Sequence, residues 1–146
     1  MAAARPTHVN RLILHTPGYM GLIDASSWGA AGVWFSGTHH LEPFVWFVQW
    51  PLAITTALCS KNNLTGHLSI CNLKLEGVVL HVLALTTYIC CYDTTLCHRT
   101  AAIWCDNLAT VHWTYKFQTS TSHVSAKILC ALAIHTWQQE AVLLDV

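Results

Sequence analysis

The sequence predicts one α/β domain, whose mixed β-sheet begins with an antiparallel three-strand meander and continues through a helix, a parallel strand and further helices. Its 146 residues are enough to form one domain with a hydrophobic core, and they are few for two such domains. Three short apolar runs separated by turn residues come first, which is typical of a meander. A long helical pattern precedes the next apolar run, and a strand reached through a helix lies parallel to its neighbour.

The N-terminal half divides into a lead-in over residues 1–18 and the start of the domain, which we expect to span 19–146. The lead-in is polar and ends in the turn dipeptide Pro17-Gly18. Three runs rich in aromatic and β-branched residues follow, bounded by Ser, Gly and Pro. These runs predict strands at Tyr19–Asp24, Trp28–Phe35 and Phe44–Trp50.

A long helix is predicted after a connecting stretch at 51–71. Asn72 is a plausible N-cap, and the apolar residues beyond it recur at steps of three and four, as with Leu73 and Leu80. Glu76 falls on that same apolar face. An acidic side chain there is costly unless it is paired, lies near the helix end or binds a metal.

The C-terminal part predicts one more strand, two helices and the beginning of a last strand. The strand at Ala101–Cys105 should lie parallel to one of the first three because it follows a helix. Helical spacing is then found at Asn107–Tyr115 and at Ser125–Gln139, with a strand-like stub at Ala141–Val146.

The composition excludes several classes of protein. Hydrophobic residues make up 53% of the chain and charged residues 10%, where a soluble domain carries about 25% charged. Intrinsic disorder is therefore excluded, and the net charge of +0 removes long-range attraction to phosphates. No uncharged run supplies about 20 clean apolar residues, so we expect an intracellular chain, cytoplasmic or nuclear, with no membrane partner.

Two aspartates stand where predicted strands end: Asp24 after the first strand and Asp106 after the later one. If these strands are parallel neighbours, the carboxylates meet at one edge of the sheet, and a helix packed on the sheet can direct Glu76 toward them. Carboxylates packed together need a cation, and oxygen ligands suit Mg²⁺ or Mn²⁺. Two such ions clamp a phosphodiester for attack by water. Taken singly, each aspartate is also explained as a turn former or cap.

Three motifs in order resemble the ribonuclease H-like domains of retroelement reverse transcriptase polyproteins. They are Leu22-Ile23-Asp24 with the hairpin that follows, Leu73–Leu80, and Ala101–Asn107. The resemblance covers roughly 19–140. It implies an enzyme that cuts the RNA strand of an RNA/DNA hybrid with two Mg²⁺ or Mn²⁺ ions, beside the reverse transcriptase domain of the same polyprotein. By position Asp24, Glu76 and Asp106 match the first three metal ligands, and Asp24 would bridge both ions.

The resemblance also implies a fourth acidic residue beyond the last strand. The sequence ends before that region, so we expect a domain truncated at its C-terminus. Asp145 lies inside the presumed last strand, and we interpret it as structural.

Two alternatives remain open at this point. A catalytically inactive retroelement remnant would keep only the fold, consistent with few basic residues for phosphate contacts unless Lys74, Arg99, Lys116 and Lys127 cluster. A small zinc-binding module is the weaker alternative, although the spacing lacks a CxxC pair. Its ligands would be Cys90, Cys91, Cys97 and His98.

Overall fold

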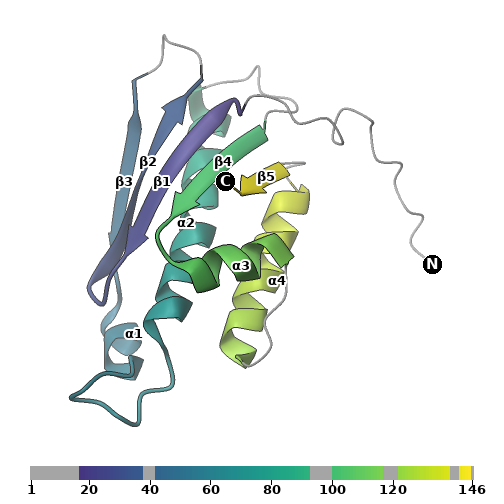
Figure 1. Ribbon diagram of the computed structural model, residues 1–146. Coiled ribbons are helices and arrows are strands. Elements are labelled where there is room, and N and C mark those ends of the chain that lie inside the picture. The colour runs from purple at the N-terminus through teal and green to yellow at the C-terminus, as the bar shows by residue number, and fades with distance from the viewer. Residues whose placement is uncertain (1–16, 38–41, 93–99, 117–121, 139–141, 146) are drawn as a thin grey trace.

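The computed structural model describes residues 17–37, 42–92, 100–116, 122–138 and 142–145. It shows a twisted five-stranded sheet with its long helices on one face (Figure 1). In chain order the elements are β1 (Tyr19–Ala25), β2 (Gly29–Ser36), β3 (Phe44–Gln49), α1 (Leu52–Ala57), α2 (Ile70–Tyr92), β4 (Thr100–Cys105), α3 (Leu108–Lys116), α4 (His123–Gln138) and β5 (Val142–Asp145).

The strand order across the sheet is β3-β2-β1-β4-β5. β1, β2 and β3 pair antiparallel in sequence order, whereas β4 pairs parallel to both β1 and β5. A tight turn joins β1 to β2, in which the amide of Ser26 donates to the carbonyl of Gly29 at 2.9 Å. The crossover through α2 reverses the chain direction and makes β4 parallel. The predicted meander, helix and parallel strand are therefore confirmed.

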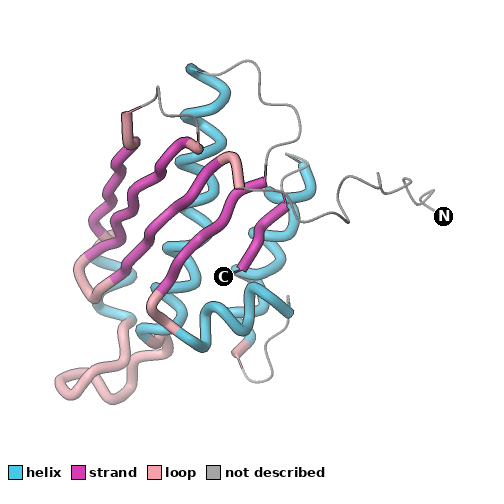
Figure 2. Tube along the Cα trace, turned by 45° about the horizontal axis from the view of Figure 1, so that its top comes forward, coloured by secondary structure: helices cyan, strands magenta, loops and turns pink. Residues whose placement is uncertain are grey.

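The sheet has one covered and one open face. Along β1 the side chains alternate, so that Tyr19, Ile23 and Ala25 are buried while Leu22 and Asp24 are exposed. α2 packs across β1 and β2 on the covered face, and α4 packs on α2. Figure 2 shows both helices behind the sheet and no helix in front of it among the described residues.

The centre of the core is built around His81, which is fully buried on the sheet-facing side of α2. Its ring stacks on Trp34 with centroids 4.0 Å apart. Trp46 Nε1 donates to His81 Nδ1 at 2.7 Å, while Trp34 Nε1 donates to the His81 carbonyl at 3.0 Å. Gly21 and Gly32 make room for the ring, since a Cβ at either position would lie within 2.5 Å of a ring nitrogen.

α2 begins at Ile70, two residues before the predicted N-cap. The cap is Ser69, and Asn72 is the third residue of the helix. The backbone amide of Asn72 donates to Ser69 Oγ at 3.3 Å, and Asn72 Oδ1 accepts from the backbone amide of Ser69 at 2.8 Å. This reciprocal pair is a capping box that uses Asn in place of Glu.

α2 is also the one helix of the described residues that is long and apolar enough to cross a membrane by length and composition. The core helix of a soluble protein meets the same test. Here the helix is packed between the sheet and α4.

Candidate carboxylate site at the end of the sheet

The structure brings Asp24 and Asp106 to the same edge of the sheet. β1 and β4 are parallel neighbours, and Ile23 of β1 is in register with Cys105 of β4. Asp24 follows Ile23 and Asp106 follows Cys105, so the two aspartates come next to each other at the ends of the two strands. Both carboxylates are mostly exposed, Asp24 at 72% and Asp106 at 67%. The amide of Ala25 donates to Asp24 Oδ1 at 2.7 Å and fixes that carboxylate at the start of the turn.

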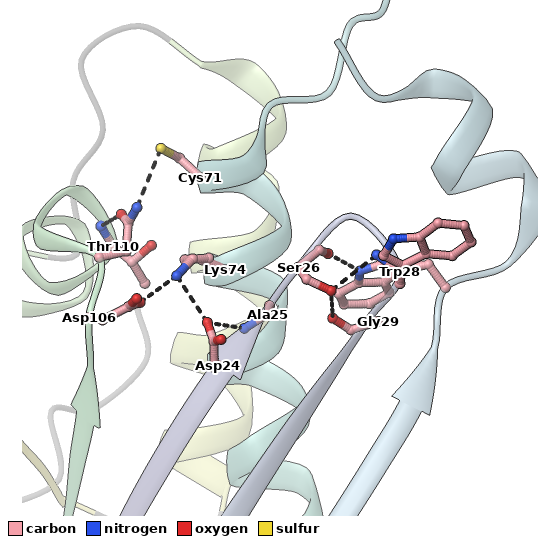
Figure 3. A network of polar contacts seen from close by, with 11 residues as sticks. Asp24, Ala25, Ser26, Trp28, Gly29, Cys71, Lys74, Asp106 and Thr110 are labelled. Carbon is pink, nitrogen blue, oxygen red and sulfur yellow. Dashed lines mark hydrogen bonds and ion pairs between the residues drawn. The ribbon is translucent and has the colours of Figure 1, made fainter. Parts of the chain in front are cut away.

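A lysine from α2 lies between the two carboxylates. Lys74 Nζ is 3.0 Å from Asp24 Oδ1 and is also hydrogen-bonded and ion-paired to Asp106 Oδ1 (Figure 3). The Lys74 side chain is only 15% exposed, so it approaches the pair from within the fold. Its pKa is raised above the ordinary value, mainly by the hydrogen bond to Asp106, against an opposing effect of burial. The ammonium therefore stays charged at neutral pH.

Helix geometry explains why Lys74 holds this position. At 3.6 residues per turn, Lys74, Gly77 and His81 form one stripe along α2. Gly77 faces Ile23 and Ala25, and His81 faces Trp34, so the stripe lies against the sheet. Lys74 lies one turn before Gly77, level with the ends of β1 and β4. Its side chain contacts the two carboxylates there.

Glu76 lies elsewhere. It is two residues from Lys74 and therefore about 200° away around the helix. It shares its side of α2 with Leu73 and Leu80, which pack in a second core cluster formed with Trp50 and Leu58. Burial raises the pKa of Glu76 above its ordinary value. Thus the structure brings two of the three predicted metal ligands together and leaves Glu76 apart from them.

Hydrogen bonds at the start of α3 hold the loop after β4. Asn107 Oδ1 accepts from the amide of Thr110 at 2.8 Å and caps the helix. Its Nδ2 contacts Cys71 Sγ on α2 at 3.7 Å. Figure 3 shows this link beside Asp106, with the Ser26–Gly29 turn on the other side of Asp24. Both carboxylates are consequently placed by ordered backbone.

The residues present do not fit a two-metal centre. Such a centre needs several anionic oxygen ligands facing the ions, whereas this site offers two carboxylates that already share one ammonium. Within the described ranges, no three His, Cys, Asp or Glu side chains form a group that could hold a metal ion. The cluster as it stands is a salt-bridged triad with one residual negative charge.

The other predicted residues are dispersed or lie outside the described ranges. The backbone of Asp145 pairs with Ile103 inside the sheet, as its interpretation as a strand residue requires. Lys116 ends α3 and Lys127 is exposed on α4. Cys90 and Cys91 are exposed free thiols near the end of α2. Arg99, Cys97 and His98 fall outside the residues that the structure describes.

Sequence reasoning missed Lys74 as a member of the site. A signal was present, because Lys74 stands three residues before Gly77, the small residue that allows close approach of α2 to the sheet. Phasing the helix on Gly77 and His81 places Lys74 at the carboxylates, whereas phasing it on Leu73 and Leu80 selects Glu76. The leucines lie on the side of the helix that packs into the second core cluster, together with Ala25 and Trp50.

Comparison with models of known protein families and with curated proteins finds no match. Among solved structures, the chain is similar to the N-terminal RNase H domain of rv2228c from Mycobacterium tuberculosis, determined as a fusion with maltose-binding protein. The TM-score is 0.52 at 11% identity, over 90% of this chain and 83% of that one. With the β3-β2-β1-β4-β5 order and α2 across the covered face, the comparison shows that the chain has the ribonuclease H-like fold.

Proposed function

We propose that this chain is a ribonuclease H-like domain of retroelement origin that keeps the fold without the two-metal hydrolysis of RNA/DNA hybrids. The observation that carries the proposal is the position of Lys74, whose ammonium contacts the carboxylates of both Asp24 and Asp106. The partners expected from that origin are an RNA/DNA hybrid and the reverse transcriptase domain of the same polyprotein.

Electrostatics supports the loss of metal chemistry. Mg²⁺ binds through anionic oxygens, and a lysine ammonium a few ångströms away repels it. Displacing the lysine would break two charge-assisted hydrogen bonds that keep it protonated. The carboxylate that the resemblance expects from α2 is also missing from the cluster, because Glu76 lies on another side of the helix.

Retroelement origin is supported by the order of the three sequence motifs and by the fold they occupy. The three motifs occur along the chain in the order that the resemblance implies. They are the hairpin with Asp24, the helix with Lys74 and the strand before Asp106, and they meet where Lys74 contacts both aspartates. The similar RNase H domain supports the fold half of this argument.

An active metal-dependent endoribonuclease is the second candidate. The convergence of Asp24 and Asp106 at the ends of parallel strands favours it, because that arrangement suits carboxylate ligands. The two candidates differ in whether Lys74 blocks the cation.

Calorimetric titration with MgCl₂ and MnCl₂, together with cleavage of a labelled RNA/DNA hybrid, separates the candidates. The parent chain should bind neither ion and leave the hybrid intact. Lys74→Glu should gain Mg²⁺ or Mn²⁺ binding, because it replaces the ammonium with a third carboxylate. Adding Asp24→Asn to that variant should abolish the gain. Lys127→Glu, which makes the same charge change on the exposed side of α4, is the matched control and should bind no ion.

Two outcomes would contradict the proposal. Metal-dependent cleavage by the parent that disappears in Asp24→Asn would establish the active enzyme instead. A folded Lys74→Glu variant that gains no ion binding would remove Lys74 as the reason for the loss.

A further inference from the structure

The edge strand β3 carries a feature that the carboxylate site does not explain. β3 is the first strand in the order β3-β2-β1-β4-β5, so its outer side has no strand partner within the described residues. Its sequence, Phe44–Gln49, contains no charge, no glycine and no proline. Natural edge strands are protected by lysine, proline or bulges, and an uncharged apolar edge is open to pairing with another strand.

The hydrogen-bonding pattern identifies which groups of β3 face outward. The amide of Trp50 donates to the carbonyl of Trp28 at 3.0 Å, which makes these two residues a hydrogen-bonded pair. Because such pairs alternate in an antiparallel ladder, Val48, Trp46 and Phe44 also bond to β2. The amides and carbonyls of Val45, Phe47 and Gln49 therefore point away from the sheet.

The same alternate residues present their side chains on the open face. Val45 is 67% exposed and Phe47 is 85% exposed. Phe44 and Trp46, which alternate with them, contact α2 on the covered face of the sheet. Phe44 stacks on Tyr88 with centroids 4.9 Å apart, and Trp46 donates a hydrogen bond to His81. β3 is thus an ordered strand whose outer edge and exposed side chains are available together.

We propose that β3 pairs antiparallel with β3 of a second copy of this chain, about a two-fold axis that passes beside Phe47. In this register Phe47 lies opposite Phe47 of the other copy, and Val45 lies opposite Gln49. Each of these pairs exchanges two backbone hydrogen bonds through the outward-facing groups. The two sheets then form one continuous sheet, and the exposed Val45 and Phe47 side chains gain apolar neighbours across the join.

A second copy is the favoured occupant because the edge is self-complementary. An antiparallel pairing of identical strands is isologous, so each copy supplies the same groups that it receives. β3 has no charged residue, so two copies of the strand do not repel each other when they pair. The chain as a whole has a net charge of +0, so the copies do not repel at long range either. Pro43 and Pro51 lie on either side of residues 44–50 and confine the pairing to that stretch.

Sedimentation equilibrium over a dilution series tests the proposal, with circular dichroism to show that each variant is folded. The parent should dissociate from two copies to one as it is diluted. Phe47→Lys and Phe47→Glu should each raise the dissociation constant at least tenfold, since like charges would lie opposite each other at the axis. An equimolar mixture of these two variants should recover two-copy species, because opposite charges then face each other.

Leu64→Lys is the matched control, since Leu64 is 82% exposed and belongs to the loop before α2, outside the pairing strand. It should leave the dissociation constant of the parent unchanged. A parent that stays a single chain at every concentration would overturn the proposal. Equal weakening by Leu64→Lys, or failure of the mixed variants to pair, would also overturn it.

Discussion

Lys74 and His81 lie on one stripe of α2, seven residues apart, and both are polar side chains placed against a sheet. Lys74 is stabilised at the sheet's edge, where two carboxylates neutralise it. His81 is stabilised at the centre, where it accepts a hydrogen bond from Trp46, while its Nε2 has no hydrogen-bond partner among the described residues. Because Nδ1 accepts, the neutral ring carries its hydrogen on Nε2, and within that part of the chain this buried donor meets no acceptor. Lys74 is thus accommodated against the sheet as a charged group paired with carboxylates, whereas His81 is accommodated there as a neutral ring.

Acid should destabilise the fold through His81. Burial lowers its pKa to about 3 from an ordinary 6.5, so the unfolded chain binds a proton that the folded chain does not. Stability from this group is fully present above pH 6.5 and is lost as the pH falls from 6.5 toward 3. Between pH 7 and 5 the loss is about 2 kcal/mol. Urea unfolding at the two pH values should show that His81→Gln has the flatter dependence.

The control for this measurement is His112→Gln, a change in an exposed histidine of α3. It should keep the parent's difference in unfolding free energy between pH 7 and 5. An identical pH dependence in the parent and in His81→Gln would show that His81 does not drive the acid effect.

The fit of His81 against the glycines of β1 and β2 predicts a specific coupling. Gly32→Ala would place a Cβ 2.5 Å from His81 Nδ1, so it should destabilise the fold by about 1–3 kcal/mol through overpacking. In the presence of His81→Ala the same change should cost less, because the ring that it strikes is absent. Denaturant unfolding of the parent, the two single variants and the double variant measures this coupling.

Gly29→Ala supplies the contrasting cycle. Its added Cβ would lie 2.3 Å from the Val48 carbonyl oxygen, a backbone atom that His81→Ala leaves in place. Its cost should therefore be the same with and without His81. Equal coupling for Gly29 and Gly32 would contradict this account of the core.

At the scale of single elements, the sequence predicted the strands well and the helices less well. Runs rich in aromatic and β-branched residues, bounded by turn residues, located β1, β2 and β3. α1 was not predicted, because six residues with none buried leave no apolar stripe to detect. The phase of α2 was misjudged because that helix is apolar on two sides, and each side packs into one of the two core clusters.

The start of α2 yields a prediction for an element. Asn72 is buried, completes the capping box with Ser69 and donates to Ser125 Oγ of α4 at 2.7 Å. Asn72→Ala removes the two side-chain bonds, to the Ser69 amide and to Ser125 Oγ, and leaves buried partners unsatisfied. It should therefore lower the free energy of unfolding by about 1–3 kcal/mol. Asn62→Ala, in the exposed turn before α2, should have little effect. Equal urea midpoints for the two variants would show that the cap contributes nothing.

At the scale of the whole molecule, the order of elements was enough to predict the topology, whereas the chemistry of the site was not predictable in the same way. A meander followed by a helix and a strand leaves few sheet orders, and the observed order is one of them. The carboxylate cluster depends on a rotation of α2 by two residues, which hydrophobic periodicity alone does not resolve. An error in the rotation of α2 therefore leaves the predicted fold unchanged, although it changes which side chains the site contains.

The distribution of buried residues predicts how the molecule opens. β1 and β2 share the largest core cluster with α2, whereas α1 has no buried residue and is six residues long. Amides of α1 should therefore exchange with solvent through local opening, while those of Ile23, Trp34 and Val82 should exchange only on global unfolding. Native-state hydrogen exchange in rising urea measures this directly. The α1 amides should show a small, urea-independent opening energy, and the core amides should converge on the global value. Protection of α1 equal to that of β1 would mean that α1 opens only together with the core.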